Sequence, residues 1–182
     1  ILMWELGNEL NCVWPKKYPL DWIREMGAHV KALDSNHLLA SGVVGLQWGD
    51  DPNDKQSWRD EITEDTALVK SNRPDVIDAV SVHYYPDPHM ADIEDPDATL
   101  RDIVRAGHEL VGKPVYLGEF NWGVRLDEGE SIETRNEHLE RWYDILAEER
   151  CGGAIIHEIS TPAIAELKSG SRGTHNIVPE ED

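Results

Sequence analysis

Residues 1–9, Ile-Leu-Met-Trp-Glu-Leu-Gly-Asn-Glu, begin with an apolar run that is too short for a helix and predicts a buried strand. The strand leads to Asn8 and Glu9, which place an amide and a carboxylic acid at its C-terminal tip. Residues 114–120, Pro-Val-Tyr-Leu-Gly-Glu-Phe, repeat this design and carry Glu119 at the tip. Two buried strands that each end in a carboxylic acid indicate acid–base chemistry on a parallel sheet or barrel. The alternative is that both glutamates are ordinary solvated residues at strand ends. For either residue alone we would favour this alternative, but for the two together we favour acid–base chemistry.

The rest of the chain alternates between strand-like and helix-like patterns, which predicts a parallel α/β chain. Further strands are predicted at about 37–43, 77–86 and 152–159, and helices at about 20–33, 58–71, 97–111 and 131–150. Candidate functional residues recur at the C-terminal ends of the strands, where a (β/α)8 barrel builds its active site. We therefore predict a partial TIM barrel. Five strands are expected where the barrel needs eight, so three are expected to be absent.

The composition is strongly acidic, with 36 Asp and Glu against 17 Lys and Arg and a formal net charge of −19. This charge argues against nucleic acids and anionic membranes as partners, because both attract positive charge. The acids are spread along the chain, which favours a salt-adapted protein over an acidic enzyme from an ordinary habitat. Melting at low and at molar salt would test this. Cys12 and Cys151 are expected at opposite ends of the barrel and are not predicted to form a disulfide.

Residue types at the strand ends suit the hydrolysis of glycosides. A retaining glycosidase needs one protonated and one ionised carboxyl group about 5–5.5 Å apart. Glu9 and Glu119 are distant in sequence, but the ends of different barrel strands converge on one opening. Asn8 can hydrogen-bond a sugar hydroxyl beside the reacting carbon. His83 and Tyr85, which share one face of their strand, can orient a carboxylate and donate hydrogen bonds to it.

Three motifs, Trp-Glu-Leu-Gly-Asn-Glu at 4–9, His-Tyr-Tyr-Pro at 83–86 and Leu-Gly-Glu-Phe at 117–120, occur in this order. They resemble the strand-four, strand-six and strand-seven motifs of family 5 glycoside hydrolases, within a large clan of retaining (β/α)8 glycosidases. The resemblance implies that residues 1–182 form the C-terminal five βα units of a catalytic TIM barrel, strands four to eight, without the N-terminal strands one to three. It also implies hydrolysis of a β-linked glucan, mannan or related glycoside through a covalent glycosyl-enzyme, with no cofactor.

The motifs assign roles to individual residues by resemblance. Glu9 resembles the general acid/base, and Glu119 resembles the nucleophile. Asn8 resembles the amide that holds the 2-hydroxyl, while His83 and Tyr85 resemble the pair that positions the substrate and the nucleophile. Glu5 alternates onto the same face as Glu9, so we expect it to be a structural residue that needs a partner inside the barrel.

Two departures from the family affect the expected site. The family usually has a tryptophan near the end of strand eight as a sugar platform, and the aligned position here is His157. Trp122 and Trp48, in loops at the predicted mouth, are candidates for stacking on sugar rings, although loop tryptophans often only pack their own loop. The arginine of strand three has no counterpart here, so Glu119 would lack a positively charged partner. Residues 1–182 alone are therefore expected to be inactive or nearly so.

Other functions stay open at this point. A β-galactosidase or β-mannosidase of the same clan is the nearest enzyme alternative. A second alternative is a non-catalytic carbohydrate-binding barrel, which only the change at His157 favours. A third is an incomplete gene product without a function of its own. The spacing of the candidate metal ligands fits no zinc motif, so we predict no metal site; these candidates are His83, His89, His157 and Glu158. Carbohydrate is the expected partner. The oligomeric state and the compartment stay open, although an extracellular location suits a polysaccharide hydrolase.

Overall fold

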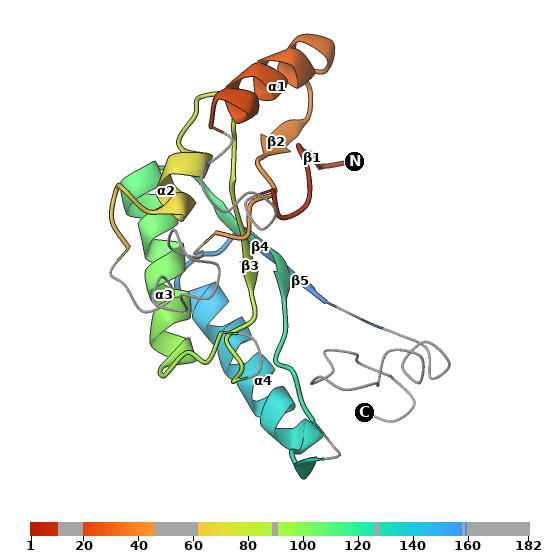
Figure 1. The fold of residues 1–182 in the computed structure, drawn as a ribbon, viewed down its shortest axis with the longest axis vertical. Coiled ribbons are helices and arrows are strands. Elements are labelled where there is room, and N and C mark those ends of the chain that lie inside the picture. The colour runs from red at the N-terminus through yellow and green to blue at the C-terminus, as the bar shows by residue number, and fades with distance from the viewer. Residues whose placement is uncertain (11–19, 46–61, 89–90, 126–127, 158, 160–182) are drawn as a thin grey trace.

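The computed structural model describes residues 1–10, 20–45, 62–88, 91–125, 128–157 and 159, along which strands and helices alternate (Figure 1). The elements are β1 Met3–Glu5, α1 Leu20–Leu33, β2 Leu38–Ala40, α2 Ala67–Asn72, β3 Val80–Tyr84, α3 Pro96–Ala106, the π-helical turn η2 Gly107–Val111, β4 Val115–Phe120, α4 Ile132–Glu148 and β5 Gly153–Ile156. Each strand pair is parallel, so the predicted parallel α/β chain is confirmed. None of the helices in these ranges combines the length and apolar composition that a membrane span would need.

The strands follow one another in space in the order of the sequence. β1 pairs with β2, and β3, β4 and β5 form a three-stranded sheet. A parallel bridge between Ala40 and Ala79 joins the two sheets. Parallel strands in sequence order, connected by helices, form the wall of a (β/α)8 barrel. Their C-terminal ends therefore lie along one edge, as the sequence analysis requires for a shared site.

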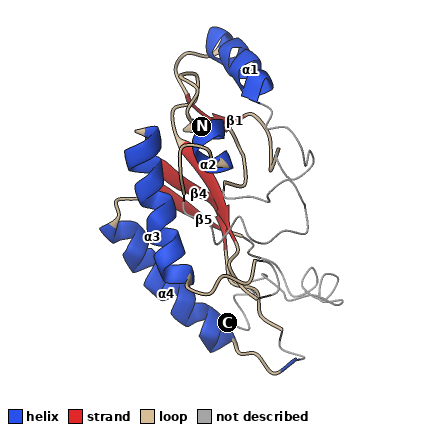
Figure 2. Ribbon diagram, turned by 60° about the vertical axis from the view of Figure 1, so that its left-hand side comes forward, coloured by secondary structure: helices blue, strands red, loops and turns tan. Residues whose placement is uncertain are grey.

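The main hydrophobic core lies between the three-stranded sheet and helices α3 and α4, which run along one face of the sheet (Figure 2). Val82, Leu117 and Phe120 enter this core from the strands, and Ile103 and Trp142 enter it from the helices. All five side chains are fully buried. Burial of each such side chain contributes about 1.5–3 kcal/mol. The helix-facing side of β3 and β4 is thus apolar, which leaves their other side to carry polar residues.

Local sequence signals explain where the two longest helices of this layer begin. The side chain of Asp95 accepts a hydrogen bond from the N–H of Ala98 at the start of α3. At the start of α4, the hydroxyl of Ser131 accepts from the N–H of Thr134 at 3.2 Å. Both are N-caps that satisfy N–H groups without a partner inside the helix. The helical segment that contains α3 ends at Gly112, whose φ of +77° suits glycine.

One predicted helix is wrong over residues 62–66. The pattern predicts a helix over 58–71, but α2 spans only Ala67–Asn72 and residues 62–66 are not helical. Residues 58–61 lie outside the described part of the chain. The hydroxyl of Thr66 donates to the carbonyl of Thr63, whose own hydroxyl accepts from the N–H of Asp65. Such bonds between side chains and backbone compete with helix formation, which explains the late start of α2.

Candidate active site

Residues at the C-terminal ends of β3 and β4 and just beyond the end of β1 bring two carboxylates and an imidazole together. Nδ1 of His83 lies 2.8 Å from Oε1 of Glu9 and 3.5 Å from Oε2 of Glu119. One oxygen from each glutamate and one ring nitrogen of His83 all lie within 4.8 Å of one another. The His83 side chain is only 1% exposed, whereas those of Glu9 and Glu119 are 32% and 23% exposed. The two carboxyl groups therefore lie beside a buried ring and remain accessible to a ligand.

Glu119 is contacted by two further residues, one after β3 and one after β5. The hydroxyl of Tyr85, just beyond β3, donates to Oε2 of Glu119 at 2.7 Å. Nδ1 of His157, just beyond β5, lies 3.8 Å from the same oxygen. The rings of Tyr85 and His157 meet edge to face, with centroids 6.0 Å apart. The hydrogen bond from Tyr85 fixes the orientation of the carboxylate.

Glu9 has a backbone conformation that few residues other than glycine adopt. Its φ is +52°, in the left-handed region. Its N–H donates at 2.7 Å to the carbonyl of Gly42, which lies just beyond β2. Gly42 itself has a φ of +72°, and a Cβ added there would lie 1.7 Å from the carbonyl oxygen of Gly7. Close contact between these two glycines therefore holds the tip that carries Glu9. Backbone strain of this kind concentrates at functional sites.

A second polar layer lies nearer the N-terminal ends of the same strands. Oε1 of Glu5 accepts hydrogen bonds from the hydroxyl of Ser81, at 3.1 Å, and from the hydroxyl of Tyr116. Glu5 thus has the partners that the sequence analysis expects it to need, although the residue itself is exposed. Burial and the bond to Glu5 raise the pKa of the Tyr116 hydroxyl. Because Glu5, Ser81 and Tyr116 belong to β1, β3 and β4, this layer joins the three strands that lead to the two carboxylates and the imidazole.

Asn121 is a residue of the site that the sequence analysis missed. It follows β4, is fully buried, and its Nδ2 donates to the main-chain carbonyl of His157. The N–H of His157 in turn donates to the carbonyl of Phe120 at 3.1 Å. These two bonds fix the backbone of His157 next to the end of β4. The only signal in the sequence was a second amide placed directly after a strand that ends in a carboxylate.

The remaining predicted binding residues lie in different surroundings. Asn8 is exposed at the tip beyond β1. The ring of Trp122 stacks on His138 of α4, with ring centroids 3.8 Å apart and 12° between the planes, and it lies 6.1 Å from the ring of Trp142. One face of this indole is therefore occupied by His138 of α4 and is closed to a sugar ring. Trp48 lies outside the described residues, and so does Cys12.

Among the described residues, Glu9, His83 and Glu119 also have ligand atoms close enough together to hold a metal ion. Two carboxylates and an imidazole are donors that a divalent transition metal accepts. However, Nδ1 of His83 lies 2.8 Å from Oε1 of Glu9 and 3.5 Å from Oε2 of Glu119, and that second oxygen also accepts a hydrogen bond from Tyr85. Hydrogen bonding therefore accounts for this arrangement without an ion.

Comparisons with known proteins agree with this geometry, although no protein-family model matches the chain. Mannan endo-1,4-β-mannosidase 3 of Arabidopsis thaliana is 31% identical over 203 residues, an alignment that covers 100% of this chain and 49% of that protein. A hyperthermostable endo-1,4-β-D-mannanase from Thermotoga petrophila RKU-1 superposes with a TM-score of 0.68 at 20% identity, covering 100% of this chain and 54% of the other. A family 5 glycoside hydrolase mannosidase from Rhizomucor miehei gives a TM-score of 0.60 at 16% identity, covering 87% and 39%. The chain is a homologue of the mannan endo-1,4-β-mannosidases, and it shares the fold of the solved family 5 mannosidase.

The resemblance stated from three short motifs is thus confirmed across the whole chain, and so is the partial TIM-barrel fold. The chain spans about half the length of the curated relatives it matches, with 45%, 48% and 49% of three of them covered.

Proposed function

We propose that this chain carries the reacting carboxyl groups of a retaining glycoside hydrolase that cleaves β-linked mannan. The observation that supports it most directly is that carboxylate oxygens of Glu9 and Glu119 lie within 4.8 Å of each other. This is close to the roughly 5–5.5 Å between the carboxyl groups of retaining enzymes and short of the roughly 6.5–9.5 Å of inverting ones. Similarity to several mannan endo-1,4-β-mannosidases supports mannan over glucan as the substrate.

In the first step, Glu119 attacks the anomeric carbon and Glu9 donates a proton to the departing glycosidic oxygen. The bond between that carbon and that oxygen breaks, and an ester joins the sugar to Glu119. Tyr85 holds Oε2 of Glu119 by its hydrogen bond, so the carboxylate is already oriented when the sugar arrives. The attacking group is therefore positioned by the fold before the substrate binds.

In the second step, Glu9 has lost its proton and acts as a base. It removes a proton from a water molecule, which attacks the anomeric carbon and releases Glu119. Nδ1 of His83 lies near both glutamates, so the ring can interact with the charged carboxylate in each step. Because the His83 side chain is buried, this interaction is little screened by water.

The test is hydrolysis of β-1,4-mannan and, for comparison, β-1,4-glucan and aryl β-galactosides by the full-length protein. Glu9→Gln and Glu119→Gln should each lower kcat on mannan at least about 10³-fold, since each removes a group that bonds or transfers a proton in the reaction. Glu133→Gln is the matched control, because Glu133 is an exposed glutamate in the first turn of α4. It should keep full activity. Wild-type activity in either site variant would contradict the assigned roles.

Two further measurements separate the roles. With an aryl β-mannoside whose leaving group needs no proton, Glu9→Gln should still form the glycosyl-enzyme, whereas Glu119→Gln should not. Proton NMR of the first product formed by the wild-type protein should show the β-anomer; the α-anomer would identify an inverting enzyme. Tight mannan binding by wild-type protein without turnover would favour the carbohydrate-binding alternative.

We also propose that residues 1–182 supply five of the eight βα units, strands four to eight. Exposed apolar side chains on the two outermost strands support this: Ile1 and Leu2, just before β1, are 82% and 77% exposed, and Ile155 in β5 is 59% exposed. Further strands paired on both edges would cover them. The isolated residues 1–182 should therefore show little or no turnover of an aryl β-mannoside. Turnover close to that of the full-length protein would contradict this.

A further inference from the structure

β4 presents two polar residues to the barrel interior at a spacing that a regular strand does not allow. Tyr116 bonds Glu5 inside the barrel, and Glu119 bonds Tyr85 there. The two residues are three positions apart. In a regular strand, side chains alternate between faces, so positions three apart lie on opposite faces. Without a further feature, Glu119 would face the helices with Leu117.

The pairing of β4 with its neighbours shows that feature. Val82 of β3 pairs with Leu117, but the next residue, His83, pairs with Glu119, so Gly118 has no partner. The pairing with β5 shifts as well, because Leu117 and Phe120 are three apart while their partners Ala154 and Ile156 are two apart. One extra residue in a strand is a β-bulge, and bulges near active sites re-aim side chains.

The helix-facing side of β4 agrees with a single bulge at Gly118. Leu117 and Phe120 are also three apart, yet both are fully buried in the core beneath α3 and α4. The extra residue therefore reverses the face of β4 to which each following side chain points. Glu119 gains the interior face, and Phe120 gains the core face.

Gly118 also leaves room for the imidazole. A Cβ added at Gly118 would lie 3.1 Å from Nε2 and 3.2 Å from Cδ2 of His83, which is tighter than ordinary contact. The other ring nitrogen of His83 is the one that reaches Glu9 and Glu119. The His83 side chain is 1% exposed, so the buried ring has little room to yield.

We propose that Gly118 is a positioning residue for both carboxyl groups. Its bulge turns Glu119 into the barrel, and its missing side chain lets His83 lie where it contacts both glutamates. This inference rests on the proposed glycosidase function and deepens it. A strand glycine without such a role would tolerate alanine, because its φ is not in the left-handed region.

The test compares Gly118→Ala with Gly153→Ala in the full-length protein. Gly153 is the matched control, because it also lies in a strand, and a Cβ added there would meet nothing within 4 Å. Gly118→Ala should lower kcat on mannan about 10²-fold, since a shift of about 1 Å in a reacting group has an effect of this size. KM should change much less. Gly153→Ala should stay within about twofold of the wild type, and both variants should melt at similar temperatures.

A double-mutant cycle separates positioning from a general loss of structure. In a His83→Ala background the imidazole is gone, so adding Gly118→Ala should lower kcat by much less than it does alone. An equal loss in both backgrounds would overturn the proposed role, and so would a Gly118→Ala protein as active as Gly153→Ala.

A wild-type protein that hydrolyses no glycoside would contradict the proposed function but not the geometry of the bulge. In that case the ring nitrogen resonances of His83 in ¹⁵N NMR spectra provide the test. Gly118→Ala should shift them and Gly153→Ala should not. Identical His83 resonances in all three proteins would overturn the inference without reference to activity.

Discussion

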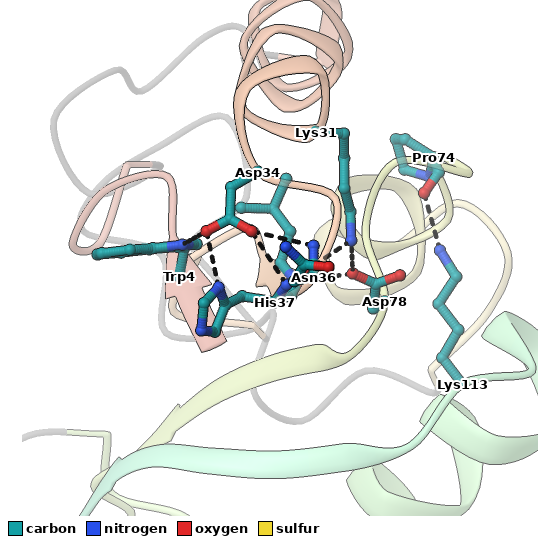
Figure 3. A network of polar contacts seen from close by, with 9 residues as sticks. Trp4, Lys31, Asp34, Asn36, His37, Pro74, Asp78 and Lys113 are labelled. Carbon is teal, nitrogen blue, oxygen red and sulfur yellow. Dashed lines mark hydrogen bonds and ion pairs between the residues drawn. The ribbon is translucent and has the colours of Figure 1, made fainter. Parts of the chain in front are cut away.

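Charged and polar side chains gather at both ends of the parallel strands, but they are paired differently at the two ends. At the N-terminal ends, charged and polar groups meet complementary partners: Lys31 pairs with Asp78, and Asp34 accepts hydrogen bonds from Trp4 and contacts the ring of His37 (Figure 3). At the C-terminal ends, two carboxylates lie within 4.8 Å of each other beside one imidazole. Two acidic groups this close repel each other whenever both are charged, whereas the opposite charges at the other end attract each other.

Lys113 is another charged residue at the N-terminal end whose side chain has complementary partners. Its Nζ donates to the carbonyl of Asn72, at the end of α2, at 2.7 Å and to the carbonyl of Pro74 at 2.8 Å. Figure 3 shows the bond to Pro74. Burial lowers the pKa of Lys113, and the nearby carboxylates of Asp75 and Asp78 oppose that shift. In a TIM barrel the N-terminal ends of the strands serve stability and the C-terminal ends serve catalysis. Substitutions should therefore affect stability at one end and rate at the other.

Among the substitutions that test this comparison, Tyr85→Phe should have the largest effect, on kcat. The substitution removes the hydrogen bond to Oε2 of Glu119 and changes little else. A hydrogen bond to a charged group is worth about 1.5–3 kcal/mol, so kcat should fall about 10- to 100-fold. The melting temperature should change by no more than about 2 °C. Steady-state kinetics on mannan and a thermal melt test both statements, with Tyr143→Phe, an exposed tyrosine of α4, as the control. If Tyr85→Phe instead lost much stability and kept its kcat, the C-terminal ends would serve stability as the N-terminal ends do, and the proposed difference would be wrong.

Asp78→Ala should have the next largest effect, on stability. It leaves the ammonium of Lys31 and the N–H of Leu39 without their carboxylate partner. Because Lys31 and Asp78 are only 27% and 31% exposed, we expect a loss of about 2 kcal/mol in the free energy of unfolding. Asp65→Ala is the control, since Asp65 is 91% exposed in its pair with Lys70 and its removal should leave the stability nearly unchanged. Urea unfolding measures both values, and kcat should be unchanged in both variants.

Tyr116→Phe tests the layer between the two ends. The hydroxyl of Tyr116 donates to Glu5, so its removal should lower the free energy of unfolding by about 1 kcal/mol near neutral pH. The folded-state pKa of Tyr116 is raised above its ordinary value of 10.0. The contribution of its protonated hydroxyl is therefore complete below about pH 10 and declines as the pH rises further. Urea unfolding of both proteins from neutral to alkaline pH should show the difference narrowing. A difference independent of pH would mean that the hydroxyl is not the cause.

Periodicity and composition were enough to predict most of this fold. The 3.6-residue spacing of Ile23, Met26 and Val30 predicted α1, and α4 was predicted from Leu139, Trp142 and Ile145. The meeting of strand ends followed from the geometry of parallel barrels, which needs no knowledge of side-chain contacts. Long-range juxtaposition was thus easier to foresee than local detail.

Several local features had no unambiguous signal. Gly118 is one glycine within an apolar strand, and nothing in the sequence distinguishes a bulge from a regular residue there. The positive φ of Glu9 depends on Gly42, which is distant in sequence, and on the contact of Gly42 with Gly7. The late start of α2 depends on side-chain bonds of Thr63 that compete with the helix. Each depends on a particular contact and not on a repeating pattern.

The smallest expected effect concerns the pH dependence of the N-terminal end. Hydrogen bonds from the indole of Trp4, the N–H of Asn36 and the ring of His37 lower the pKa of Asp34 well below its ordinary value of 3.8. A lowered folded-state pKa contributes stability that is present above about pH 3.8 and is lost as the pH falls further. Trp4→Phe removes the largest of these contributions and keeps an aromatic ring.

Wild-type protein should therefore melt slightly above Trp4→Phe at neutral pH, and the gap should shrink as the pH falls below about 3.8, because protonated Asp34 accepts the indole N–H less strongly. Trp22→Phe is the control, since Trp22 of α1 is 39% exposed and Trp4 is 40% exposed. Its difference from the wild type should not follow the titration of a carboxylate. Thermal melts from neutral to acidic pH decide the matter: a gap for Trp4→Phe that stays constant would show that the ring packs at this end without holding the charge of Asp34.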